Sequence, residues 1–182
     1  MKRIAVLVLG FAAMSAGAFA QDQAAIDKAL MAAPGNLKKD ATVIKWKSDY
    51  TYDTLKQGTN NLVCYDKSGM PMNQAFSVEC TDKGNLPRVE QNLKAEAMPG
   101  GRGAVNTALT KMESDGSRVK PVFGSVWYHA MGPDAEHLRM HMTIAVPGAT
   151  TASMGLPDNG KAGGVWIMNA GTSTAHLMTP GE

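Results

Sequence analysis

The sequence VKPVFGSVWYHAMGPDAEHLRMHMTIAV, residues 119–146, is the most informative about the fold class. It holds two runs rich in β-branched and aromatic residues, Val119–Tyr128 and Arg139–Val146, with a Gly-Pro turn between them. Runs of this kind separated by turn residues are typical of antiparallel strands. Val165–Met168 and Ala175–Met178 repeat the pattern further along the chain. We therefore predict a mostly antiparallel sheet in the C-terminal half.

The first half of the chain alternates shorter elements with turns. Apolar residues recur at helical spacing in three segments, which predicts two or three short helices: Gln23–Ala33, Pro87–Ala97 and Ala104–Met112. Alternating apolar and polar residues predict strands at Thr42–Lys47, Leu62–Tyr65 and Phe76–Cys80. Because most helices precede the main strand runs, the pattern favours a single α+β domain over alternating βαβ units.

The N-terminal twenty residues have the features of a secretory signal peptide. Basic Lys2 and Arg3 precede an apolar run, and Ala18-Phe19-Ala20 supplies a cleavage site. The apolar run is shorter than the ~20 residues of a transmembrane helix, so we expect no membrane insertion. Gln21 follows the site instead of the cysteine of a lipoprotein. We expect a signal peptide at residues 1–20 and a periplasmic or secreted globular domain at residues 21–182.

The charge of the mature chain bears on its partners. Removal of Lys2 and Arg3 leaves 16 basic residues against 16 acidic ones. A neutral chain lacks the basic patch that nucleic acid or anionic lipid requires. We expect no nucleic-acid partner, and instead an unknown small ligand or an envelope protein.

Cys64 and Cys80 are the only cysteines of the chain. A pair of thiols exported to an oxidising compartment usually forms a disulfide. A metal-bound or redox-active pair is the alternative, although the spacing is neither C-x-x-C nor a paired zinc pattern.

Two stretches resemble a family of secreted bacterial proteins that is itself uncharacterised. The first is LKQGTNNLVCYD, residues 55–66, where a Gly-Thr-Asn turn precedes the first cysteine, followed by VECTD, residues 78–82. The second comprises HLRMHMTIAVPG, residues 137–148, and GLPDNGKAGGVWIMNAGTSTAHLMTP, residues 155–180, with a Gly-Thr-x-x-Ala-His-x-Met signature. The resemblance implies export, a cysteine pair and a shared C-terminal sheet, and it implies no known reaction.

Familiar catalytic templates are incomplete in this sequence. His137 and His141 have the spacing of a zinc-protease helix, but Leu138 replaces the glutamate that activates water. Ser173 lies in a turn that is similar to a nucleophile elbow, but only His176 and Glu182 follow it, in the wrong order for that fold. Enzymatic activity is therefore uncertain, and the sequence favours a non-enzymatic binding or envelope-associated domain.

Histidine and methionine lie close together along the chain, which suggests copper as a cofactor. Imidazole and thioether are ligands that Cu(I) prefers, and residues two apart on a strand share a face. The candidate ligands are His129, Met131, His137, Met140, His141, Met142, His176 and Met178. The alternative is that these residues only pack in the sheet, since methionine commonly fills gaps in small cores. No other cofactor is expected. A hydrolase of unfamiliar type is a further alternative, which would hold His129, His137 or His176 against a carboxylate in a concave site.

Overall fold

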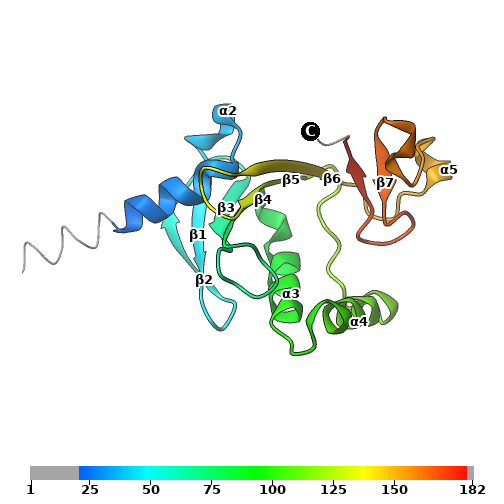
Figure 1. The fold of residues 1–182 in the computed structure, drawn as a ribbon, viewed down its shortest axis with the longest axis horizontal. Helices are drawn as coiled ribbons and strands as arrows, with labels where there is room; N and C mark the ends of the chain where they lie inside the picture. The colour runs from blue at the N-terminus through cyan, green and yellow to red at the C-terminus, as the bar shows by residue number, and fades with distance from the viewer. Residues whose placement is uncertain (1–20, 180–182) are drawn as a thin grey trace, which may run out of the picture.

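A mixed eight-stranded sheet runs through the molecule in the order β2-β1-β3-β4-β5-β6-β8-β7 (Figure 1). The computed structural model describes residues 21–179, so the predicted signal peptide lies outside the described residues. All neighbouring strands are antiparallel except β1 and β3, which are parallel. The strands are β1 Thr42–Trp46, β2 Tyr52–Lys56, β3 Leu62–Asp66, β4 Phe76–Asp82, β5 Val126–Gly132, β6 Arg139–Ala145, β7 Trp166–Met168 and β8 His176–Met178.

Helical segments cover parts of both faces of the sheet. Residues 21–29 are helical and continue into η1, whereas α3 and α4 lie on the other side of the sheet (Figure 1). The bounds are η1 Leu30–Ala32, α2 Gly35–Lys38, η2 Lys83–Asn85, α3 Leu86–Glu96, α4 Gly101–Ser114, α5 Thr151–Met154 and η3 Gly160–Ala162. Within residues 21–179, no helix combines the length and the apolar character that crossing a membrane requires.

The α+β prediction is confirmed, but the sheet is not confined to the C-terminal half. Half of its strands, β1 to β4, precede α3. The strand β2 was not predicted, because it is an edge strand whose first three residues are exposed and carry little apolar pattern. The predicted strand Val119–Tyr128 is wrong over residues 119–125, since β5 begins at Val126. Side chains of α3 bind the backbone of those earlier residues: Gln91 accepts from the Val119 N–H, and Arg88 donates to the Val119 carbonyl.

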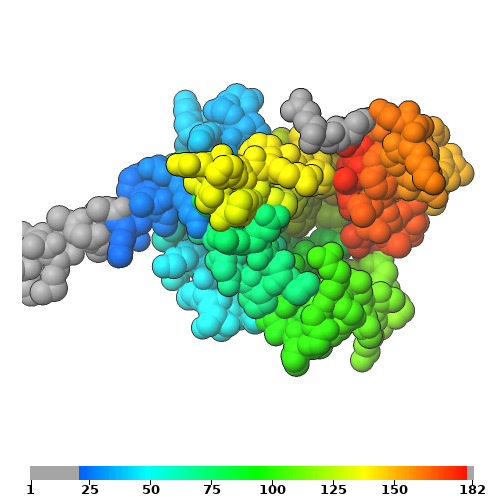
Figure 2. All heavy atoms as spheres, viewed as in Figure 1, coloured from blue at the N-terminus to red at the C-terminus, as the bar shows by residue number. Residues whose placement is uncertain are grey.

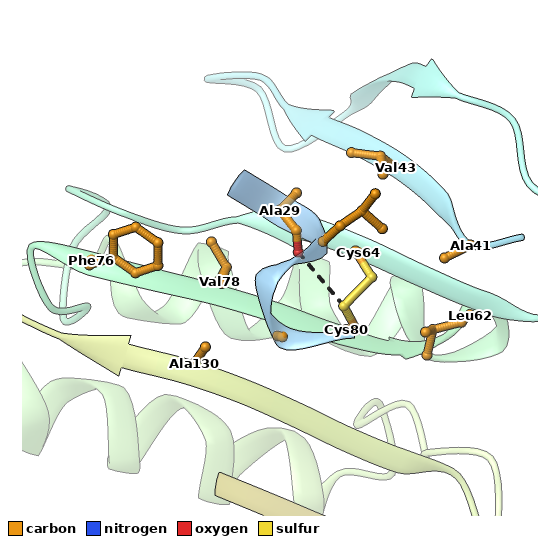
Figure 3. Close-up of a cluster of buried hydrophobic side chains, with 11 residues drawn as sticks. Ala29, Ala41, Val43, Leu62, Cys64, Phe76, Val78, Cys80 and Ala130 are labelled. Atoms are coloured by element: carbon orange, nitrogen blue, oxygen red, sulfur yellow. Dashed lines mark hydrogen bonds between the residues drawn. A yellow bond between two sulfur atoms is a disulfide. The ribbon is translucent and has the colours of Figure 1, made fainter. Parts of the chain in front are cut away.

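The disulfide lies in the core on the face that the N-terminal helical segment covers. Cys64 on β3 and Cys80 on β4 are directly opposite one another and are joined as predicted, with Cα atoms 4.1 Å apart (Figure 3). Both are fully buried among apolar residues that include Val43, Val78 and Ala130. The Ala29 carbonyl oxygen lies 3.8 Å from Sγ of Cys80; because a disulfide sulfur carries no proton, this is a packing contact.

The opposite face of the same strands packs against α3. Leu86, Val89 and Leu93 of α3 are buried against β1 and β3, where the buried Trp46 and Tyr65 rings meet edge to face. These three helix residues are three and four apart, so they form one stripe. The neighbouring stripe of α3 is polar and comprises Arg88, Asn92 and Glu96. It faces the part of the sheet that β5, β6 and β8 form.

The Gly-Thr-Asn turn before β3 packs tightly against the start of β1. The backbone N–H groups of Thr59 and Asn60 both donate to the Asp40 carbonyl. A Cβ atom at Gly58 would lie 2.3 Å from backbone atoms of Asp40 and Ala41, so only glycine fits there. The turn therefore fixes where β3 starts, and with it the position of Cys64.

Candidate functional site

A cleft of about 380 Å³ lies between α3 and the sheet. Strands β5, β6 and β8 supply one wall, on the face that carries Trp127, His129 and His141. The opposite wall includes three polar residues of α3 spaced four apart, which places them on one side of the helix: Arg88, Asn92 and Glu96. The rest of the lining is Leu109, Arg118, Pro121, Thr143, Ala145, Thr174, Ala175 and His176.

Two buried arginines line this cleft. The relative exposures of Arg88 and Arg118 are only 4% and 7%. Their hydrogen bonds go to neutral oxygens: Arg88 donates to Thr174 Oγ1 at 2.9 Å, and Arg118 donates to Gln91 Oε1 at 3.1 Å and to Asn92. Within residues 21–179, no carboxylate oxygen lies within 4.0 Å of either guanidinium.

The electrostatics of the arginine pair reflect this lack of a direct counter-charge. Burial, followed by repulsion from Arg88, lowers the pKa of Arg118 to about 10. Burial also lowers the pKa of Arg88, and the more distant charge of Glu113 opposes that shift. Since the pKa of Arg118 stays near 10, and arginine side chains keep their proton in proteins, both guanidinium groups are charged at pH 7.

Glu113 of α4 holds the C-terminal segment beside the arginines. Its carboxylate accepts hydrogen bonds from the Ser173 backbone N–H at 2.6 Å and from the Ser173 hydroxyl at 2.5 Å. Burial alone would raise the pKa of Glu113, but the Ser173 hydrogen bonds and the two arginine charges lower it overall. Figure 2 shows the C-terminal segment (orange and red) next to α4 (green), in agreement with these bonds. Ser173 is thus a structural contact and not an exposed nucleophile.

A buried polar cluster contacts the cleft residues His129 and Glu96. Glu79 of β4 is 5% exposed and lies between three partners. Tyr65 donates its hydroxyl proton to Oε1 at 2.5 Å, Lys67 Nζ lies 3.6 Å from Oε2, and His129 Nδ1 lies 3.3 Å from the same oxygen. Lys67 Nζ also lies 3.6 Å from Glu96, the last residue of α3. Lys67 therefore connects Glu79 on the sheet with Glu96 on α3.

The charge states of this cluster follow from its contacts. Burial alone would raise the pKa of Glu79, but the charges of Lys67 and His129 and the hydrogen bonds from His129 and Tyr65 lower it strongly. Burial would lower the pKa of Lys67, and the two nearby carboxylates raise it overall. Burial and the Glu79 charge raise the pKa of Tyr65, so this hydroxyl keeps its proton. At pH 7 Glu79 is a carboxylate that faces His129.

Three of the four histidines line the cleft. His129 and His141 are directly opposite on β5 and β6, with ring centroids 5.9 Å apart. Burial, and then the charges of His129, Arg139 and His176, lower the pKa of His141 below its ordinary value of 6.5. His176 is paired with Ala145, four residues beyond His141, which is roughly 13 Å along the strand. The imidazoles therefore form a row along the cleft and do not meet at one point.

The structure separates the predicted copper ligands. Met140 and Met142 are on the opposite face of β6 from His141, because Met140 is paired with Ala130 of the disulfide core. They are 62% and 38% exposed. Met131 shares the face of His129 but is two residue pairs further along, opposite Arg139. Met178 shares that face as well, opposite Thr143, and is a diagonal neighbour of His141.

His137 lies outside the cleft, in the connection between β5 and β6. Its side chain is 70% exposed, and its Nδ1 lies 2.8 Å from Oδ1 of Asp134. In the part of the chain that the structure describes, no three His, Cys, Asp or Glu side chains are placed to hold a metal ion together.

Sequence reasoning found the histidines of the cleft but missed the charged residues around them. Glu79 alternates with Phe76, Val78 and Cys80, a pattern that predicts a strand with one face in water. That face is buried, because α3 packs near it. No family model, curated protein or solved structure matches this chain. The resemblance to a secreted bacterial family stays a prediction.

Proposed function

We propose that the protein is an exported domain that binds a small anionic ligand in the cleft between α3 and the sheet. The observation that carries the proposal is the pair of buried guanidinium groups, Arg88 and Arg118, with no carboxylate within 4.0 Å among residues 21–179. Burying an ion costs several kcal/mol unless a counter-charge compensates for it. A bound anion would supply that counter-charge to both residues.

The chemistry of the lining indicates the class of ligand. Guanidinium groups bind carboxylate and phosphate oxygens through paired N–H donors. The hydroxyls of Thr143 and Thr174 and the amide of Asn92 add neutral polar groups, and Trp127 adds an apolar wall. The volume of 380 Å³ is that of a small-molecule site. A small carboxylate or phosphate compound fits this combination.

Thermal unfolding in the presence of small anions tests the proposal. We would add inorganic phosphate or glutarate to the purified mature protein at constant ionic strength, with chloride as the balancing salt. A ligand at 100 times its Kd stabilises the folded state by about 2.7 kcal/mol. For a domain of this size we expect a rise in Tm of roughly 5–10 °C.

Two arginine variants make the test specific. Arg118→Gln removes one cleft charge, and we expect it to lose most of the anion-dependent rise in Tm. Arg102→Gln is the matched control, because Arg102 is an exposed residue of α4 that does not line the cleft. If no anion raises Tm, or if Arg118→Gln responds like the wild type, the proposed site is wrong.

Copper binding is the second candidate, favoured by the adjacent rings of His129 and His141. A Cu(I) ion bound there would need a thioether as well, and Met178 is the diagonal neighbour of His141 on the same face. Titration of metal-free protein with Cu(I) against a chelator tests this candidate. Competition at micromolar affinity that is lost in Met178→Leu would support it, and the absence of competition would exclude it.

A further inference from the structure

The buried cluster around Glu79 reaches two residues of the cleft, Glu96 and His129, and of these His129 is the one that contacts Glu79 itself. We infer that the cleft is an active site in which His129 is the general base for hydrolysis of a small ester that carries a carboxylate or phosphate group. This inference rests on the anion binding proposed above, because the arginines would hold the charged end of the substrate. Glu79 is a positioning residue.

The geometry of His129 suits a general base. Its Nδ1 lies 3.3 Å from Oε2 of Glu79, and a carboxylate at that distance favours the neutral tautomer with its proton on Nδ1. Nε2 then carries the lone pair, and the ring lines the cleft. A carboxylate that orients an imidazole in this way is the arrangement that hydrolytic enzymes use to prepare a base.

The cost of the cluster argues for a role beyond packing. Tyr65, Lys67 and Glu79 are all less than 9% exposed, and two of them are charged. Buried charges of this kind seldom stabilise a fold better than apolar residues would. Here they hold the Glu79 carboxylate in one place, with Tyr65 on one oxygen and Lys67 and His129 near the other. Perturbed ionisable groups that converge on a cleft residue are characteristic of active sites.

The length of the proposed substrate is taken from two residues of α3, one beside Arg118 and one beside the Glu79 cluster. Arg118 binds Asn92, and Glu96 contacts Lys67 of the cluster behind His129. Asn92 and Glu96 are one helical turn apart, about 6 Å along α3. An acyl chain with its anionic group three or four bonds from the ester carbon spans that distance. Monoesters of glutaric acid have this form.

The proposed reaction is ordinary ester hydrolysis with water as the only co-reactant. Nε2 of His129 accepts a proton from water while the water oxygen forms a bond to the ester carbonyl carbon. The tetrahedral intermediate then loses the alkoxide, the bond between the carbonyl carbon and the alkoxy oxygen breaks, and the alkoxide takes the proton back from Nε2. The products are one carboxylic acid and one alcohol, and His129 returns to its starting state.

The test uses mono-4-nitrophenyl glutarate as the substrate and uncharged 4-nitrophenyl acetate as the comparison. We expect the wild-type protein to hydrolyse the glutarate ester above the buffer rate and in preference to the acetate. His129→Gln should lower kcat/KM by at least 100-fold. His137→Gln is the matched control, since that histidine is exposed and outside the cleft, and it should leave the rate unchanged.

Glu79→Gln separates positioning from structure. We expect kcat to fall about 10-fold with little change in KM, because the imidazole loses the carboxylate that orients it while the residues that bind the substrate stay in place. A variant that only loosened the fold would change KM as well as kcat. If His129→Gln does not fold, the wild-type rate alone still tests the inference. A wild-type protein that hydrolyses the glutarate ester no faster than buffer does would overturn it.

Binding and hydrolysis are measured separately, so the two proposals fail separately. Glutarate that raises Tm through Arg118, together with no hydrolysis of its ester, would overturn the catalytic role of His129 and leave the ligand site intact. The absence of any effect of glutarate or phosphate on Tm would overturn the ligand site itself. Hydrolysis that is equal in wild type and His129→Gln would also refute the assignment of the base.

Discussion

Reduction of the Cys64–Cys80 disulfide should destabilise the protein by about 3 kcal/mol. The bond closes a loop with a sequence separation of 16 residues. In the chain-entropy treatment, closing a loop of that length lowers the conformational entropy of the unfolded state by roughly 10 cal/mol/K. At 25 °C this entropy corresponds to a free energy of about 3 kcal/mol. For a domain of this size, such a loss corresponds to a fall in Tm of roughly 6–12 °C.

The assay is urea unfolding followed by tryptophan fluorescence, with and without a phosphine reductant. Trp46 is a suitable reporter because it is buried and contacts Tyr65 on the strand that carries Cys64. The double variant Cys64→Ala/Cys80→Ala is the second measurement. It should lose somewhat more than reduction does, about 1 kcal/mol for each cavity left by a fully buried sulfur.

The reasoning would be refuted if the oxidised and reduced proteins unfolded at the same urea concentration. The disulfide would then contribute nothing beyond the pairing of β3 with β4, which holds the two cysteines opposite one another in any case. A double variant as stable as the oxidised protein would lead to the same conclusion.

Three other perturbations have defined outcomes. Asn85→Ala should cost about 1–3 kcal/mol in urea unfolding, because the fully buried amide bonds Thr81, Ser125 and the Val122 N–H, and its removal leaves these groups unpaired. Glu79→Gln should lower the unfolding free energy at pH 7 by about 3 kcal/mol, since it removes a buried ionic partner. The pKa of Glu79 in the folded state lies below 4.5, so the Glu79 carboxylate stabilises the wild-type protein fully only above that pH. The difference in unfolding free energy between wild type and Glu79→Gln should therefore narrow as the pH falls from 5 to 3. The same difference at pH 5 and pH 3 would contradict the assignment of Glu79 as a charged, buried carboxylate. Burial lowers the pKa of His141 below 6.5, so its ring is neutral at pH 7 and gains a proton only at lower pH. As the pH falls, the affinity of wild type for glutarate, measured by calorimetry, should therefore increase relative to the affinity of His141→Gln. The same pH dependence in both proteins would count against a place for His141 at the site.

The fold was largely predictable because its signals are local. Alternation along Thr42–Trp46, Leu62–Asp66 and Phe76–Asp82 and the turn residues between them are read from neighbouring positions. The helix over Leu86–Glu96 also follows from its own spacing. The errors fall where distant residues intervene, as in residues 119–125, whose backbone is bound by α3.

The candidate site was only half predictable. A period of two along β5 correctly placed His129 and Met131 on one face. The partner of His129 is Glu79 of β4, and Glu79 in turn contacts Lys67, the residue after β3; both are far from His129 in the sequence. No local pattern marks Arg88 or Arg118, since each looks like an ordinary surface arginine in a polar stretch.

Residue order alone was enough for the strand alternation, the paired cysteines and the prediction of export. Strand alternation and the export signal depend on neighbouring residues, and the pairing follows because the chain has only two cysteines. Whether a polar face of the sheet meets water or a helix depends on how α3 packs, and that packing buried Glu79, Arg88 and Arg118 around one cleft. Burial turns ordinary charged residues into a site, because a charge withdrawn from water must find its partner within the protein or in a ligand.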